Sequence, residues 1–223
     1  MLKNLSQETV GEIAFRCIRD DIVGGELAPG SKLKLDWAKE RYGISVSTLR
    51  EILCRLTAES LVVAEGQRGF FVSAVSRREL AELAELRILL EGHAMESAFA
   101  KGDLEWEARL VAAHHKLSVI ERALLERAAV GRTVDWVRYD WEFHKALVTD
   151  GEYGPLMAML SSVFDRFLRY HLLARSFRGR AVADDHRRLF ELALERNAPA
   201  AKAMLATHVR NGVDHVLASG RIP

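Results

Sequence analysis

The stretch that decides the fold of the first part of the chain is Ile44-Ser45-Val46-Ser47-Thr48-Leu49-Arg50-Glu51-Ile52-Leu53. Ser45 is a typical helix N-cap, and the apolar residues after it recur every three or four positions, which predicts a helix over 45–58 with one buried side. The opposite side carries short hydroxyls and one long cation, a combination that can enter the major groove of DNA. The residues of that side are Val46, Ser47 and Arg50, with Thr48 as a further candidate.

The flanking segments complete a helix-turn-helix and a hairpin. A short helix is predicted over 36–42, and because it stops at Gly43 the two helices are joined by a tight turn. Downstream, the apolar runs 61–64 and 70–72 enclose a glycine-bounded loop with Gln67, Arg68 and Gly69 near its tip, which is typical of a β-hairpin.

Two further segments lie upstream. A helix is predicted over 7–23, with its apolar face against the helix over 45–58. After a turn at 28–30 come Lys32 and Lys34, which on a winged-helix layout would lie near DNA phosphates. A solvated basic loop is the alternative for either lysine taken alone.

Taken in order, these segments resemble the winged helix of GntR-type bacterial transcription regulators. The resemblance implies a homodimeric regulator with an amino-terminal domain that binds double-stranded operator DNA and a carboxy-terminal effector domain. Val46 stands where many relatives carry an arginine, so the operator sequence cannot be transferred from a relative. The resemblance rests on Ala28-Pro29-Gly30-Ser31-Lys32-Leu33, Tyr42-Gly43-Ile44-Ser45, Leu49-Arg50-Glu51 and Gly66-Gln67-Arg68-Gly69-Phe70. The DNA-binding residues expected on this basis are Lys32, Lys34, Ser45, Ser47, Thr48, Arg50, Gln67, Arg68 and Gly69.

Composition is that of a soluble globular protein. The chain has 223 residues, of which 49% are hydrophobic and 28% charged. It has no apolar run near the ~20 residues that span a bilayer and no signal peptide at its start, so we expect a cytoplasmic protein. Net charge is only +1, but residues 32–55 hold six basic and three acidic side chains, a local patch suited to phosphates. Cys17 and Cys54 fall within apolar helical faces and are expected to be buried free thiols.

The second part of the chain is predicted to be helical throughout. Ser76-Arg77-Arg78-Glu79 predicts a capping box that opens a long helix, so the domain boundary is placed between residues 75 and 76. Helices are predicted over 77–100, 103–129, 133–149, 154–176, 180–196 and 199–218. The expected fold class is mainly α: a winged helix-turn-helix DNA-binding domain over 1–75, then an all-α antiparallel helical bundle over 76–223 for effector binding and dimerisation.

One aspartate and three histidines on three of these helices form a candidate metal site. Asp140 and His144 lie four residues apart and project from one stripe of one helix, while His186 and His208 lie on two later helices. Three imidazoles and a carboxylate suit a divalent first-row transition metal. The competing interpretation is four ordinary core or surface residues, since the chain has eight histidines.

A second resemblance bears on this choice. The helical half is similar to the FCD-type effector domain of FadR-like GntR regulators, and in the metal-bearing members an Asp-x-x-x-His helix is completed by two later histidines. This resemblance implies that Asp140, His144, His186 and His208 are metal ligands. Zinc is the first choice of metal, with nickel, iron or manganese as alternatives.

The expected role of the metal is to hold a small organic acid at coordination positions that the protein leaves open. Arg87 is a candidate for binding a second carboxylate of that effector, and a surface ion pair with Glu91 is the equal alternative. Arg166, Arg169 and Tyr170 are weaker effector-binding candidates. The other histidines are interpreted as structural: His93, His114, His115, His171 and His215.

The sequence therefore predicts a DNA-binding transcription regulator whose operator binding is modulated by a small carboxylate bound at a metal. The resemblance to the family implies a repressor rather than an activator. The first alternative is a DNA-binding dimer with a structural metal, or none, that responds to no metabolite. A metal-dependent enzyme is the third hypothesis. We expect no enzyme, because no paired general base occurs at motif spacing and an enzyme would leave the winged helix unexplained.

Overall fold

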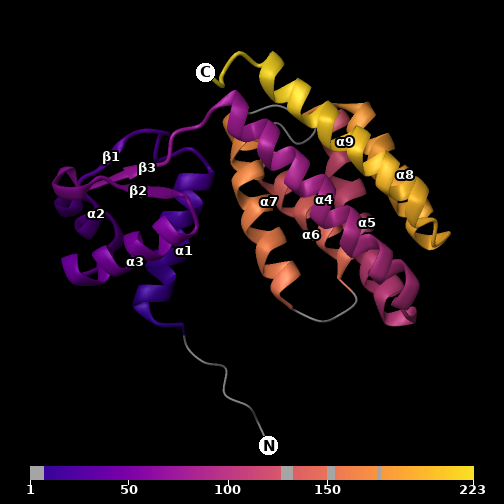
Figure 1. Cartoon of the computed structure of the whole chain (residues 1–223), viewed down its shortest axis with the longest axis horizontal. Helices are drawn as coiled ribbons and strands as arrows, with labels where there is room; N and C mark the ends of the chain where they lie inside the picture. Colours follow the sequence, from indigo (N-terminus) through magenta and orange to yellow (C-terminus); the bar gives the residue numbers. More distant parts are fainter. Residues whose placement is uncertain (1–7, 127–132, 150–153, 175–176) are drawn as a thin grey trace, which may run out of the picture. The chain divides into compact units, whose positions relative to one another are not determined.

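The structure is a computed structural model that describes residues 8–126, 133–149, 154–174 and 177–223 (Figure 1). The chain divides into two compact units, Met1–Val75 and Ser76–Pro223. The fold is mainly α, a winged helix-turn-helix followed by an all-helical unit, as the sequence predicts. Within the described ranges, no helix combines the length and the apolar character needed to cross a bilayer.

The described residues of the first unit form three α-helices, a 3₁₀ turn and a small sheet. The α3 helix is capped by Ser45, whose Oγ accepts a hydrogen bond from the Thr48 N–H at 3.1 Å. Gly43 ends α2 in the left-handed region, with φ of 64°, and this allows the tight turn between α2 and α3. The elements are α1 (Val10–Val23), β1 (Lys32–Leu33), α2 (Leu35–Tyr42), α3 (Val46–Ala58), β2 (Val62–Ala64), the 3₁₀ turn η1 (Gly66–Arg68) and β3 (Phe70–Val72).

The core of this unit lies on the predicted side of α3. Leu49, Ile52, Leu53 and Leu56 are each at most 2% exposed. The sheet has the order β1-β3-β2 with both pairs antiparallel, and Phe71 of β3 pairs with Lys32 on one side and Val63 on the other. The hairpin of β2 and β3 is the predicted one. Strand β1 was not predicted, because two residues are too short to show a period; it forms by pairing with β3.

Two local predictions on α1 and α3 were wrong. The α1 helix begins at Val10 rather than residue 7, because Thr9 and Glu12 form a full capping box there; residue 7 itself lies outside the described residues. Cys17 and Cys54 are free, as expected, but exposed. Each adjoins a buried residue, Ile18 and Leu53 respectively, and one step along a helix turns a side chain by about 100°.

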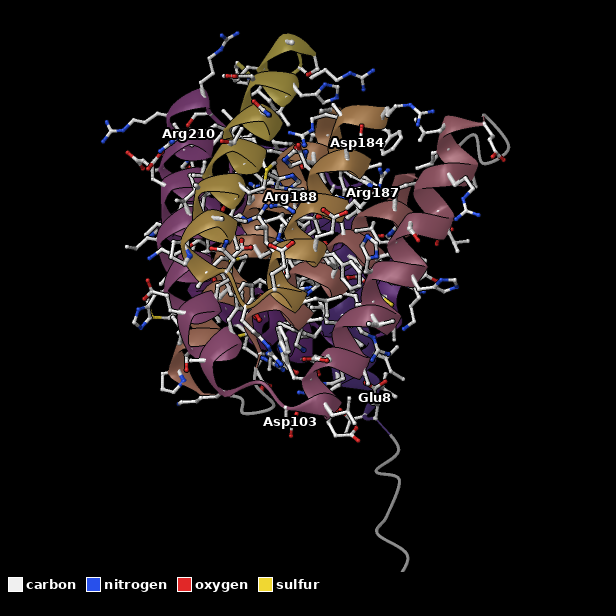
Figure 2. The ribbon with its side chains drawn as sticks, turned by 90° about the vertical axis from the view of Figure 1, so that its right-hand side faces the viewer. Glu8, Asp103, Asp184, Arg187, Arg188 and Arg210 are labelled. Carbon is white, nitrogen blue, oxygen red and sulfur yellow. The ribbon has the colours of Figure 1, made fainter. Side chains whose placement is uncertain are left out.

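The second unit is a bundle of six described helices, at the places predicted. The α4 helix packs against α9, α7 and α6, while α5 packs against α6 and α8, and α8 against α9. Figure 2 shows charged side chains such as Arg187, Arg188 and Arg210 on the outer face of α8 and α9. The predicted helix ends over 127–129 and 175–176 lie outside the described residues. The bounds are α4 (Arg77–Lys101), α5 (Leu104–Leu125), α6 (Thr133–Val148), α7 (Pro155–Ala174), α8 (Arg180–Leu194) and α9 (Ala198–Ala218).

The first turn of α4 is held by α7. Ser76 caps α4 by accepting the Glu79 N–H at 3.1 Å, but the Glu79 carboxylate does not return the bond of the predicted capping box. It instead accepts a hydrogen bond from the Tyr170 hydroxyl at 2.5 Å and pairs with Arg166. The same hydroxyl accepts the Ser76 N–H at 3.1 Å. Tyr170 and Arg166 of α7 therefore hold the first turn of α4, where the second unit begins.

Candidate functional site

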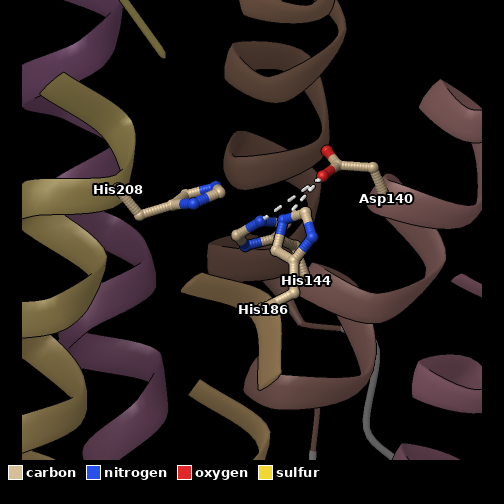
Figure 3. A group of neighbouring side chains, drawn as sticks. All are labelled: Asp140, His144, His186 and His208. Atoms are coloured by element: carbon tan, nitrogen blue, oxygen red, sulfur yellow. Dashed lines mark ion pairs between the residues drawn. The ribbon is translucent and has the colours of Figure 1, made fainter. Parts of the chain in front are cut away.

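The four residues predicted as metal ligands meet inside the second unit (Figure 3). One potential ligand atom from each lies within 4.8 Å of the others, although the residues come from α6, α8 and α9. All four are buried, with exposed fractions of 7% for Asp140, 0% for His144, 0% for His186 and 6% for His208. Because α6 carries Asp140 and His144 one turn apart, a single helix provides half of the cluster.

Each histidine of the cluster is oriented by a carboxylate on its outer side. An ionised carboxylate only accepts hydrogen bonds, so His144 and His186 donate from Nδ1 and turn Nε2 toward the centre. Nδ1 of His208 lies 3.3 Å from both the Asp185 carboxylate and the Arg178 guanidinium. The Nε2 atom of His144 is buried and has no hydrogen-bond partner among the described residues, while that of His186 lies 3.0 Å from Oδ1 of Asp140, another member of the cluster. Metal-binding histidines have this arrangement, in which the second ring nitrogen donates to a carboxylate. The Nδ1 partners are Glu91 for His144 at 2.9 Å, Glu121 for His186 at 2.7 Å and Asp185 for His208 at 3.3 Å.

The charges around the cluster do not balance. Glu91 is paired with Arg87 at 2.5 Å, and Asp185 with Arg178 at 2.7 Å. Asp140 and Glu121 have no ion pair with any lysine or arginine in the described part of the chain; each instead lies beside His186, on opposite sides of its ring. Uncompensated buried charge is costly, so this pocket favours added positive charge.

The pKa values follow from this imbalance. Burial alone would lower the pKa of His186, but the hydrogen bonds and charges of Asp140 and Glu121 outweigh it and raise that pKa to about 9. Burial would raise the pKa of Asp140, yet His186 and His144 hold it below its ordinary range. His208 has no such carboxylate at its inner nitrogen, and burial lowers its pKa well below the usual value. Without an ion, the cluster therefore holds a proton on His186.

Arg87 lies beside the cluster and forms the alternative ion pair with Glu91. This pair is buried rather than at the surface, because the two side chains are 3% and 1% exposed. The guanidinium also lies over the rings of Phe164 and Phe167, 4.3 and 4.7 Å from their centroids. Arg87 still lines the cavity next to the cluster, so pairing with Glu91 does not remove it from a ligand's reach.

Arg169 and Tyr170 lie elsewhere on α7. Neither is among the residues that line that cavity. Tyr170 uses its hydroxyl for Ser76 and Glu79, and Arg169 is buried with a pKa lowered by burial. The structure thus does not bring these two candidates to the four-residue cluster, because they project from other sides of α7 than the cavity-lining residues.

The residues predicted to contact DNA form two groups on the first unit. At the start of α3, the Ser45 hydroxyl is 2.8 Å from the Ser47 hydroxyl and 2.9 Å from the Thr48 hydroxyl, and Arg50 follows on the exposed side. This group presents hydroxyls and one cation at the end of a helix.

The second group gathers on the wing, defined here as β2, η1 and β3, and on the adjacent β1. Lys32 and Arg68 both lie over the ring of Phe71, at 5.8 and 5.6 Å. Arg68 also pairs with Glu65 at 2.6 Å and remains 76% exposed. Gln67 is exposed at the tip, Gly69 is half-buried, and Lys34 is exposed just before α2. The sheet register therefore brings together two cations that are distant in sequence.

Comparison with known proteins agrees with this arrangement. Residues 12–72 match the family described as bacterial regulatory proteins, gntR family, and residues 82–211 match the FCD domain, which alone covers more than half of the chain. The chain belongs to the GntR family. It is a DNA-binding transcription regulator with an FCD domain, so the resemblance noted in the sequence is confirmed.

Named relatives of this GntR regulator align over most of its length. It is 34% identical to the uncharacterized HTH-type transcriptional regulator BphR of Paraburkholderia xenovorans, over 92% of this chain and 84% of that protein. It is 30% identical to the HTH-type transcriptional repressor GlaR of Escherichia coli, over 87% of this chain and 90% of that protein.

Two solved structures share the fold of this GntR regulator. A GntR-type regulator from Rhodococcus sp. RHA1 superposes with a TM-score of 0.74 at 23% identity, covering 93% of this chain and 97% of that one. E. coli McbR/YncC gives a TM-score of 0.76 at 18% identity, covering 96% of this chain and 100% of that one.

A cavity lined by Asp140 and His208 adjoins the cluster in this GntR regulator. His171 and His215, interpreted from sequence as structural, both line it, as does Arg178. Sequence reasoning also missed Glu121 and Asp185 beside the histidines. A signal existed for Glu121, which stands four residues after Leu117 on the apolar stripe of α5. Asp185 gave no signal, because it precedes His186 in sequence but contacts His208 in space.

Proposed function

We propose that this GntR regulator acts as a homodimer that holds a divalent transition metal, zinc in the first instance, on Asp140, His144, His186 and His208. Binding of a small carboxylate at that metal modulates the affinity of the regulator for operator DNA. The observation that carries the proposal is the charge imbalance of the cluster: two buried carboxylates, Asp140 and Glu121, face one imidazole, and within the described chain neither forms an ion pair with a lysine or arginine.

The residues present fit such an ion. Three nitrogen donors and one oxygen donor suit zinc and its first-row neighbours. The Nε2 atoms of His144 and His186 would bind the ion, the first having no hydrogen-bond partner among the described residues and the second facing only Asp140 of the same cluster. Glu91, Glu121 and Asp185 fix the orientation of the three rings from outside. A divalent ion also balances the two unmatched carboxylates, which no neutral ligand could do.

Bound there, the metal would supply coordination positions for a carboxylate oxygen of the effector. Around it the chain provides a cavity with apolar walls from Trp136, Phe167 and Val182 and two cations, Arg87 and Arg178. Both guanidiniums are already paired with carboxylates, so they would add hydrogen bonds to an acid rather than a full net charge. The chemistry of this lining therefore suits a small organic acid.

On the DNA side, the proposal assigns α3 to the major groove, with Ser47 and Arg50 at bases or phosphates, and Arg68 of the wing to the minor groove. Lys32 and Lys34 would contact backbone phosphates. The effector must favour one state of the dimer, and a tenfold change in operator occupancy needs about 1.4 kcal/mol of differential binding. We assign the regulator as a repressor, because a relative 30% identical to it carries that name.

The test begins with protein purified without chelators. We expect close to one equivalent of metal per chain by elemental analysis, and its loss in His186→Ala with retained helical content. His115→Ala, an exposed histidine on α5, is the matched control and should keep its metal. Full metal content in His186→Ala would refute the ligand set.

The response to acids separates the proposal from its alternatives. Operator DNA selected by the protein from random fragments is titrated in the presence of a panel of two- to six-carbon acids, with and without chelator. We expect at least one acid to change operator affinity only in the metal-loaded protein. A metal-loaded protein that ignores every acid would indicate a structural metal, and chemical turnover of an acid would favour the enzyme hypothesis.

A further inference from the structure

The cavity beside the metal ligands holds one polar side chain whose bonding the proposed function does not yet explain. His171 of α7 lines this cavity together with Asp140 and His208. Its Nε2 atom is buried and has no hydrogen-bond partner among the described residues. A buried polar atom without a hydrogen bond destabilises the folded protein unless a ligand or a water molecule hydrogen bonds to it.

The imidazole of His171 is uncharged. Burial lowers its pKa to about 3, and the nearby positive charges of Arg87 and Arg178 act in the same direction, although Asp140 opposes them. A neutral imidazole offers one donor and one acceptor, and it does not attract a second carboxylate as a guanidinium does. His171 is therefore matched to an uncharged oxygen of a ligand.

Gly212 on α9 keeps the space that this imidazole occupies. It lies one helical turn after His208, and a Cβ at this position would be 3.2 Å from Cε1 and 3.5 Å from Nε2 of His171. Glycine is unfavourable in the interior of a helix, so its presence in α9 indicates a packing reason. The ring of Phe167, one turn earlier on α7, lies 4.9 Å from that of His171. The imidazole is thus held between α7 and α9 at the wall of the cavity.

We infer that His171 is an effector-binding residue that hydrogen bonds an uncharged oxygen, a hydroxyl or carbonyl, of the acid held at the metal, and that Gly212 keeps it in place. The inference rests on the proposed function, because it needs a ligand in the cavity. It adds selectivity: the effector carries an oxygen besides its carboxylate, and the site discriminates against the same acid without it.

The test measures binding of three matched pairs of acids to the zinc-loaded protein by calorimetry: lactate and propionate, malate and succinate, 2-hydroxyglutarate and glutarate. For the wild type we expect tighter binding of the hydroxy acid in the pair that fits. In His171→Phe that preference should fall by about tenfold while zinc content stays constant. His171→Gln, whose amide can reach the same region, should recover part of it, and His115→Phe on the exposed side of α5 should match the wild type.

Gly212→Ala provides the second arm. It should weaken binding of the hydroxy acid in the wild-type background, because the new methyl group displaces the imidazole, but have little effect in a His171→Ala background. Purely additive effects would show that Gly212 does not act through His171.

The outcomes separate the two levels of the argument. If no acid binds the metal-loaded wild type, the proposed function fails and this inference with it. If an acid binds but His171→Phe keeps the wild-type affinity and preference, the inference alone is overturned and the metal-held acid stands.

Discussion

Replacement of Glu121 by glutamine tests the outer support of the metal centre without removing a ligand. The Oε1 atom of Glu121 accepts from His186 Nδ1 at 2.7 Å and from the Trp136 indole N–H at 3.3 Å. Because both bonds go to one oxygen, a glutamine can keep both by placing its carbonyl there. The substitution therefore removes one buried negative charge and leaves the hydrogen bonds in place.

The expected loss of zinc affinity is about tenfold to hundredfold, the usual range for an outer partner of a metal-binding histidine, or about 1.4–2.7 kcal/mol. Near neutral pH the measured loss of zinc affinity is smaller than this, because zinc competes with a proton. In the metal-free protein Glu121 helps to raise the pKa of His186 to about 9, so zinc must displace a proton there. Glu121→Gln lowers that pKa and makes the proton easier to displace. The loss should accordingly be larger at pH 9 than at pH 7.

The assay is competition for zinc against a coloured chelator at both pH values, with melting temperature as a check on folding. Glu126→Gln is the matched control, since Glu126 is exposed at the end of the same helix. If Glu121→Gln binds zinc as tightly as the wild type at pH 9, the negative charge of Glu121 does not favour metal binding.

Three further predictions concern the rest of the molecule. Arg50→Ala should weaken binding to the selected operator by about tenfold and reduce the dependence on log salt by about one unit, as measured by fluorescence anisotropy, while sedimentation shows an unchanged dimer; unaltered binding would mean that α3 is not the DNA-contacting helix. Gly43→Ala should lower the free energy of unfolding of the first unit by about 1–2 kcal/mol in urea, because alanine is strained at φ of 64°, and no change would contradict the turn geometry. Zinc binding at pH 7.5 should release about one proton, since the pKa of His186 is about 9 without metal, and the apparent affinity should rise with pH up to that value. Calorimetry in two buffers of different ionisation enthalpy measures the release, and zero release would show that His186 is not protonated beforehand.

The sequence predicted the features that depend on local pattern. The apolar stripe of Leu49, Ile52, Leu53 and Leu56 gave α3 and its buried side, and the spacing of Asp140 and His144 placed two residues of the cluster on one turn of α6. The resemblance to a family then supplied His186 and His208, which spacing alone could not distinguish from other histidines.

The features that were missed depend on contacts between distant segments. Strand β1 forms only because it pairs with β3. Glu79 does not complete its capping box because its carboxylate accepts a hydrogen bond from Tyr170, which is 91 residues away in sequence. The Nδ1 partners of the histidines, such as Glu121, come from other helices and become visible only when the helices are packed. His171 was judged structural because no local pattern separates a cavity wall from a core position.

The placement of α7 has a consequence for how the two units could communicate. Within two turns it lines the cavity with Phe167 and His171 and also clasps the start of α4 through Tyr170. A guest molecule that tilts or rotates this helix would strain the bonds at Ser76, the first residue after the amino-terminal unit. The motion of one helix, rather than rearrangement of the whole bundle, would be enough to link an occupied cavity to Ser76, where the second unit begins.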